Sequence, residues 1–195
     1  MVKNTNKDKT IILKIIYNEQ YFSKHSLENF AAAIDMLRSI ISICPDEIWY
    51  KEKKFYYMAY HTVIFLDYYL SSPVKDFTPD LPYTLGDPDH LPADAIDDVL
   101  PNAHYSKTEM LDYLSTIREK CKDLICLSST EKLASKWIKE EEIDMHGLCP
   151  SVVTNYSLLE ILFYNLRHVQ HHVGQLNLLL RQKADIAAGW IAMAD

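Results

Sequence analysis

The chain has 195 residues, of which 48% are hydrophobic and 24% charged, and it carries a formal net charge of −7 with a pI near 5.6. These values are ordinary for a globular protein, and the length suits a single domain over residues 1–195. An acidic surface repels the phosphates of nucleic acids, and no stretch approaches the roughly 18 uncharged apolar residues of a membrane span. We therefore expect no nucleic acid and no membrane among its partners.

The N-terminal segment and the cysteines predict a cytoplasmic location. The apolar run from Ile11 to Ile16 is interrupted by Lys14 and has no small-residue cleavage site after it, so it does not read as a signal peptide. Without export, cysteines that lack CxxC spacing are expected to be free thiols. These cysteines are Cys44, Cys121, Cys126 and Cys149.

The first predicted helix runs from about Ser26 to Ile43 and stops before Pro45. Its apolar residues recur at intervals of three and four, which places them on one stripe of a helix. They are Leu27, Phe30, Ile34, Leu37 and Ile41. Residues 10–22 are expected to add one or two helical turns before this segment.

The second predicted helix covers about Lys54 to Leu70 and is rich in aromatic residues, which we expect to fill the core. About thirty residues follow it, from Val74 to Tyr105, and they hold five of the eight prolines. Structureless connections of this length are uncommon in compact domains and are often lids or crossovers. We expect this one to lie near the mouth of a site.

The third predicted helix begins at a capping box formed by Ser106 and Glu109. The connection after it is expected to hold a short helix around Glu131 to Glu141, and the fourth helix then covers about Val153 to Gln182. Four amphipathic stretches of similar length and only four glycines predict an all-α fold. The expected architecture is an antiparallel four-helix bundle with the long proline-rich connection between helices two and three.

A histidine pair in the fourth predicted helix is the sharpest chemical signal in the chain. His168 and His172 are four residues apart, so they lie one helical turn apart on the same face. They share this face with Ile161 and Leu179, which indicates that the pair points inward. Two imidazoles so placed can bind one divalent metal ion. The alternative is a pair of core histidines satisfied by hydrogen bonds.

His61 is the candidate for a third ligand, because it lies mid-helix in the aromatic second segment. His171 is the competitor, but it is turned about 100° around the helix from His172, toward the outer face. Cys121, on the inward stripe of the third helix, is the strongest rival for a fourth ligand. The other histidines precede the first stripe or lie in connections: His25, His90, His104 and His146.

The segment Tyr60-His61-Thr62 and the motif His168-x-x-x-His172-x-Gly174-Gln175-Leu176 together resemble the DinB-like superfamily. The resemblance covers residues 26–182 and is most specific at the second motif. It implies a four-helix bundle in which His61, His168 and His172 hold one metal ion. Members with known activity include thiol-dependent transferases and isomerases. Many members have an arginine where this chain has Val173, and Arg167 is the nearby residue that could replace its charge.

Four other residues have simpler expected roles. Gln175 is expected to be a helix-packing amide rather than a support for a metal ligand, and Gly174 to permit close approach of another helix. Asp67 is expected to be solvated. Arg167 is expected to pair with a surface carboxylate.

Three neutral histidines leave a divalent ion with its full charge and an open coordination position, which is the plan of catalytic zinc sites. Zinc or nickel is expected, with iron as an alternative. Such an ion can activate a low-molecular-weight thiol that attacks an electrophile, or it can activate water.

We therefore expect a small-molecule substrate and a metal-dependent enzyme of the thiol-dependent S-transferase type. The alternatives are a metal-dependent hydrolase and a non-catalytic metal-binding protein. The sequence identifies no general base, although His171 or a loop residue near His90 could serve, and a homodimer is left open.

Overall fold

Four long helices make up most of the chain in the computed structural model, which describes the backbone of residues 5–194 and the side chains of residues 20–194. Residues 1–4 and 195 lie outside the described part. The helices are α1 (Thr5–Ile43), α2 (Asp46–Lys51), α3 (Lys53–Tyr69), α4 (Lys107–Leu127), α5 (Thr130–Ala134) and α6 (Leu158–Ala184). Single 3-10 turns cover Val74–Asp76, Pro88–His90, Glu140–Glu142 and Ser151–Val153. The predicted predominance of helix is confirmed.

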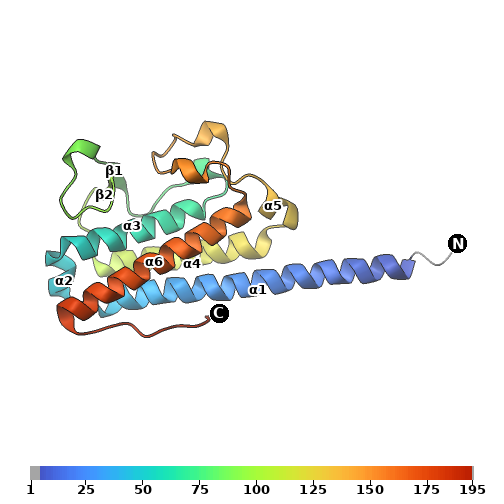
Figure 1. Ribbon diagram of the computed structural model, residues 1–195, viewed down its shortest axis with the longest axis horizontal. Helices are drawn as coiled ribbons and strands as arrows, with labels where there is room; N and C mark the ends of the chain where they lie inside the picture. The colour runs from blue at the N-terminus through green and yellow to red at the C-terminus, as the bar shows by residue number, and fades with distance from the viewer. Residues whose placement is uncertain (1–4, 195) are drawn as a thin grey trace.

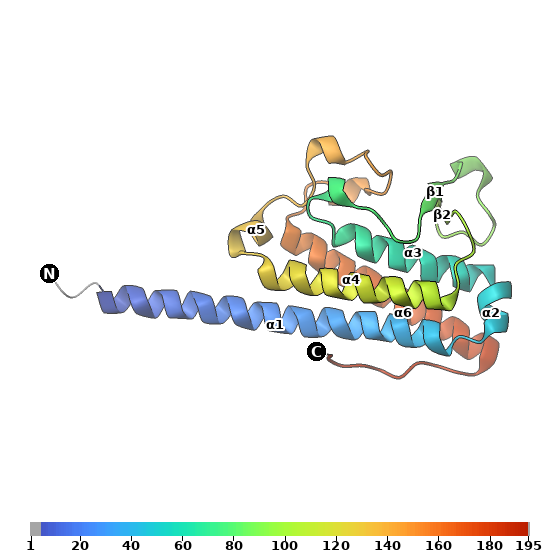
Figure 2. The same cartoon turned by 180° about the vertical axis from the view of Figure 1, so that it is seen from behind.

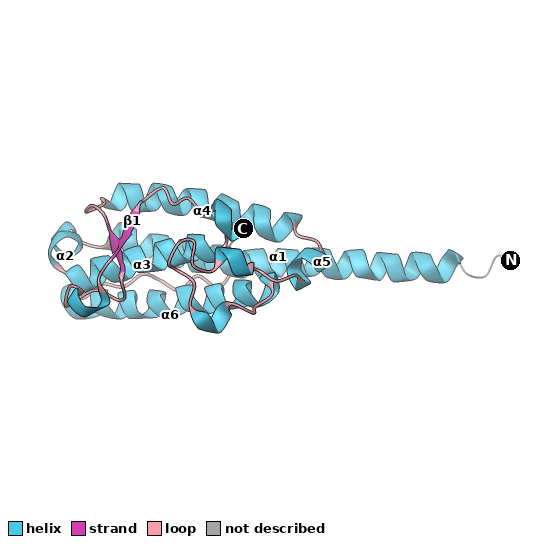
Figure 3. Cartoon of the chain, turned by 90° about the horizontal axis from the view of Figure 1, so that it is seen from above, coloured by secondary structure: helices cyan, strands magenta, loops and turns pink. Residues whose placement is uncertain are grey.

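The long helices α1, α3, α4 and α6 lie side by side, and the N-terminal part of α1 extends well beyond the other three (Figures 1 and 3). Helix α4 packs on α1 in the opposite direction, as shown by contacts of Arg118 with Asp35 and of Ser115 with Arg38. Helices α3 and α6 also run in opposite directions. The long connection brings the chain back to the end at which α3 began, so α3 and α4 run in the same direction (Figure 2).

Several element boundaries differ from the predictions. Helix α1 begins at Thr5, far ahead of Ser26, because no glycine or proline interrupts the chain before Pro45. Helix α6 begins at Leu158, because Ser157 and Glu160 form a capping box there. The segment predicted as a helix over residues 131–141 instead contains α5 and a separate 3-10 turn. The predicted capping box at the start of α4 is confirmed.

The proline-rich connection is not structureless, because it contains a two-stranded antiparallel ladder. Strand β1 (Tyr83–Leu85) pairs with β2 (Val99–Pro101), with Thr84 opposite Leu100. The residues between the strands lead away from the helices and return to α3 before β2, where Asp97 contacts His61 (Figure 1). Residues 83–101 therefore form a hairpin-like unit, which we call the β excursion.

Helix α3 is buried on nearly all sides, since every residue from Met58 to Tyr69 is buried. Its outward side is covered by both long connections, residues 74–105 and 131–157, which lie on the same side of the molecule (Figure 1). Hydrogen bonds from tyrosine hydroxyls hold the connection over residues 74–105 in place. Tyr60 donates to the carbonyls of Leu81 and Pro82 at 3.0 and 2.9 Å, and Tyr105 donates to the Pro82 carbonyl at 2.8 Å. The tyrosines thus anchor a segment whose prolines lack N–H donors.

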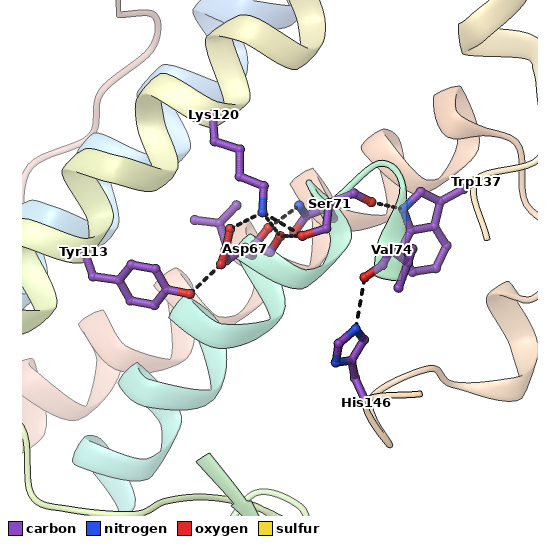
Figure 4. Close-up of polar contacts among 9 residues, drawn as sticks. Asp67, Ser71, Val74, Tyr113, Lys120, Trp137 and His146 are labelled. Carbon is purple, nitrogen blue, oxygen red and sulfur yellow. Dashed lines mark hydrogen bonds and ion pairs between the residues drawn. The ribbon is translucent and has the colours of Figure 1, made fainter. Parts of the chain in front are cut away.

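Asp67 is buried, with 3% of its surface exposed, so the expectation of a solvated carboxylate is wrong. Its carboxylate accepts hydrogen bonds from Lys120 Nζ at 2.6 Å and from the Tyr113 hydroxyl (Figure 4). Lys120 also donates to Ser71 Oγ at 2.6 Å. Figure 4 shows both α4 side chains reaching toward the C-terminal end of α3. These hydrogen bonds replace the hydrogen bonds to water that the carboxylate loses when it is buried.

Two further observations complete the fold. A Cβ atom added at Gly174 would meet nothing within 4 Å, so the expected role of this glycine in close helix packing is wrong. Among the described helices, none combines the length and the apolar character required to cross a membrane.

Candidate metal centre

The antiparallel contact between α3 and α6 brings His61 close to two histidines that are far from it in the sequence. His61 lies mid-way along α3, and His168 and His172 lie one turn apart on the facing side of α6. Near the histidines, Asn165, fully buried on α6, donates to the Leu66 carbonyl of α3 at 3.0 Å and so connects the two helices. The site therefore rests on two rigid helices, as the sequence predicts.

The Nε2 atoms of the three rings converge. His168 Nε2 lies 3.0 Å from His61 Nε2 and 3.1 Å from His172 Nε2. The nitrogens of all three residues that could bind an ion lie within 4.8 Å of one another. Two nitrogens 3.0 Å apart can both lie about 2.1 Å from one point, which is the length of a metal–imidazole bond. Each of the two close pairs, His61 with His168 and His168 with His172, thus has a spacing that fits two bonds to one divalent ion.

The outer nitrogens of two rings each face an oxygen atom that favours one tautomer. His172 Nδ1 lies 2.8 Å from Gln175 Oε1, and His61 Nδ1 lies 2.9 Å from a carboxylate oxygen of Asp97. An oxygen acceptor at Nδ1 favours the form that carries its proton there, which leaves a lone pair on Nε2. Gln175 therefore accepts a hydrogen bond from His172, and it is not only a helix-packing amide.

With these tautomers, hydrogen bonds among the three rings cannot satisfy all of their Nε2 lone pairs. The Nε2 atoms of His61 and His172 both present lone pairs, and one Nε2–H on His168 can point at only one of them. His61 and His172 are 7% and 8% exposed, so a lone pair left over there would be poorly hydrated. A divalent cation accepts all three lone pairs at once. The donor set thus fits a metal better than it fits a self-contained hydrogen-bonded core.

The environment of the rings also favours their neutral, metal-binding form. Burial, together with charge repulsion from the neighbouring His61, His172 and His171, lowers the pKa of His168 to about 3. Burial and His61 likewise lower the pKa of His172 to about 4, partly opposed by the hydrogen bond that its Nδ1 donates to Gln175. Metal ligands must be deprotonated to bind, so these two rings are ready for a cation at neutral pH.

The rival ligands are not part of the cluster. Within the described residues, the group able to hold an ion contains His61, His168 and His172 and excludes both His171 and Cys121. His171 is exposed on the outer side of α6. Cys121 is buried elsewhere, and burial raises the pKa of its thiol to about 12. His90 is exposed and pairs with Asp87 at 2.7 Å.

A cavity of about 360 Å³ adjoins His168 on the outer side of α6 and is lined by Tyr164, Arg167, His168 and His171. Tyr164 lies parallel to the His168 ring, with 6.4 Å between the ring centroids. Among the described side chains Arg167 has no ion pair or hydrogen bond, so the expected surface pairing is not found. Two larger hollows, of about 420 and 700 Å³, contain none of the three histidines.

Asp97 is the residue of this site that the sequence did not reveal. It lies in the β excursion, in a run of three acidic residues and one apolar pair with no motif around it. Only the folding of the excursion over α3 brings its carboxylate to His61. The long connection was expected near the site, but no spacing in the sequence singles out Asp97.

Comparisons with models of protein families, with curated proteins and with solved structures gave no match to this chain.

Proposed function

We propose that His61, His168 and His172 hold one divalent metal ion in a DinB-like four-helix bundle. The observation that carries the proposal is the convergence of three buried or half-buried Nε2 atoms, two of which have their lone pairs directed inward by Asp97 and Gln175. Zinc and nickel are the favoured ions, since neutral imidazoles suit both, and iron is the alternative.

We further propose that the protein is an enzyme, and that its reaction is the transfer of a low-molecular-weight thiol to an electrophilic small molecule. The ligand count supports catalysis, because structural zinc sites normally have four protein ligands and only three are found among the described residues. The ion would supply Lewis acidity that lowers the pKa of a thiol or a water molecule. The choice of a thiol rests on the resemblance of the His61 and His168/His172 motifs, and hydrolysis is the alternative.

The residues around the cavity have separate roles in this proposal. Arg167 and Tyr164 can orient a polar substrate beside His168, and His171 can hold or accept a proton at the cavity wall. His171 is preferred to His90 as a base, because His90 is not among the residues that line this cavity.

Metal analysis of protein purified without a metal-affinity column tests the metal site. We expect one divalent ion per chain in the natural protein and in His171→Ala. His61→Ala, His168→Ala and His172→Ala should each weaken binding more than about 100-fold, the upper end for residues that merely support a ligand. Circular dichroism checks that each variant remains helical. Full occupancy in folded His168→Ala would contradict the assignment.

Cobalt loading tests whether the site is open, and so separates an enzyme from a structural site. A thiol added to the cobalt protein should change its visible absorption and create an intense near-ultraviolet band from a cobalt–thiolate bond. If that band is already present without added thiol and disappears in Cys121→Ser, a protein thiolate closes the site and catalysis is excluded.

A further inference from the structure

Asp97 is held in place on both of its carboxylate oxygens. Oδ1 accepts a hydrogen bond from the Val99 backbone N–H at 3.1 Å, at the start of β2. Oδ2 lies 2.9 Å from His61 Nδ1. The side chain is 28% exposed, so water can reach it but does not separate it from the ring. The carboxylate is thus fixed by the β excursion and aimed at the back of one histidine.

The contact with His61 is electrostatic rather than a straight hydrogen bond. His61 Nδ1 is buried and has no aligned hydrogen-bond partner among the described residues, although the Asp97 oxygen is within 2.9 Å. A carboxylate accepts only, so a lone pair on Nδ1 would face a negative oxygen at this distance. The favourable state has the proton on Nδ1 and the lone pair on Nε2, toward His168.

We propose that Asp97 is a positioning residue that holds His61 in its metal-binding tautomer. This inference rests on the proposed metal site and adds a second function to the β excursion, which carries the tautomer-setting group to the one ligand that α3 contributes. Gln175 performs the same task for His172 from within α6. The supporting residues of a metal site typically change its affinity by 10- to 100-fold.

The substitution Asp97→Asn separates this role from a structural one. Asparagine has a single side-chain acceptor, and the Val99 N–H already requires it. The amide NH₂ would then face His61 Nδ1, favour a lone pair there and move the ring proton to Nε2, toward the other histidines. Asparagine therefore preserves the shape and the backbone contact while reversing the tautomer.

Asp98→Asn is the matched control. It removes one negative charge from the adjacent residue, and the Asp98 side chain has no hydrogen bond or ion pair among the described residues. The two variants change the long-range field on a cation to a similar extent. A difference between them reports the specific contact of Asp97 with His61.

Two measurements on the full chain test whether Asp97 sets the tautomer of His61. Zinc affinity by chelator competition should fall by about 10- to 100-fold in Asp97→Asn and by less than about threefold in Asp98→Asn. Nitrogen-15 NMR of the metal-free protein should show His61 protonated at Nδ1 in the natural protein and in Asp98→Asn, and at Nε2 in Asp97→Asn. An unchanged His61 tautomer, or equal zinc affinities in the two variants, overturns the inference. Failure of the natural chain to bind zinc overturns the proposed function instead, and the tautomer measurement still reports on Asp97.

Discussion

At the scale of single residues, the three histidines differ in what surrounds their outer nitrogens. His61 faces a carboxylate and His172 faces an amide oxygen, whereas the buried Nδ1 of His168 has no partner among the described residues. The Nε2 atom of His168 lies close to the Nε2 atoms of both other rings, and the residue borders the cavity. His168 is therefore the one histidine of the cluster whose Nδ1 faces no partner, in the described part of the chain, that would favour one tautomer.

The lowered pKa values of His168 and His172 predict acid sensitivity of the metal-free protein. Unfolded histidines titrate near about 6.5, but the folded rings titrate near 3 and 4, so the unfolded state binds more protons between these values. The free energy of unfolding should then fall as the pH drops below about 6.5, by about 1 kcal/mol per histidine between pH 7 and 5.5.

Urea unfolding of chelator-treated protein at these two pH values measures this loss. The decrease in the free energy of unfolding between these pH values should be smaller in His168→Gln than in His171→Gln. The second variant is the control, because it alters an exposed neighbour on the same helix. A fall of equal size in both variants would show that His168 does not carry the pH dependence.

At the scale of helices, α3 depends on its neighbours for the polar groups that it buries. Asp67 would be an unpaired charge without Lys120 and Tyr113 from α4. In the other direction, Tyr60 of α3 donates to the Leu81 carbonyl of the proline-rich connection. The aromatic richness of this helix therefore serves both packing and hydrogen bonding. Both functions hold the covering segments over the side of α3 that no long helix covers.

Removing Lys120 should destabilise the α3–α4 contact strongly. Lys120→Met leaves the buried Asp67 carboxylate with Tyr113 alone, and we expect a loss of about 3 kcal/mol, at the low end for a broken buried pair because Lys120 is 33% exposed. The double variant Asp67→Asn/Lys120→Met should recover at least half of the loss, since no unpaired charge remains.

Chemical denaturation measures these differences, and Lys122→Met is the control. Lys122 lies on the exposed side of the same helix, where substitutions change stability by less than about 0.5 kcal/mol. If Lys120→Met costs no more than Lys122→Met, the network does not stabilise the folded state.

At the scale of the whole molecule, the features that the sequence predicts are those determined by residues close together in the chain. The stripe from Leu27 to Ile41 and the capping box at Ser106 each depend on neighbours within one or two turns, and the structure contains both. The predicted cluster of His61, His168 and His172 also follows from helical spacing and inward-facing position, and the structure brings the three together.

The unpredicted features depend on contacts between distant segments. The burial of Asp67 requires knowing that α4 runs alongside α3, and the role of Asp97 requires knowing that the β excursion folds back over His61. The start of α6 is different, because the Ser157 and Glu160 capping box was present in the sequence and outweighed the apolar residues before it.

The separation of 107 residues between His61 and His168 has a kinetic consequence. Contacts between segments so far apart in the chain carry a high entropic cost of loop closure, so we expect the docking of α3 on α6 to follow the main folding barrier. An ion that binds only the docked pair would then stabilise the native state without assisting the transition state. At a free metal concentration of 100 times Kd, unfolding should slow about 100-fold while the folding rate stays the same. Stopped-flow measurements with and without zinc give the folding and unfolding rates separately. If zinc instead raised the folding rate about 100-fold, the α3–α6 contact would already be formed in the transition state. On this account the metal sets the lifetime of the folded molecule and has no part in how quickly it forms.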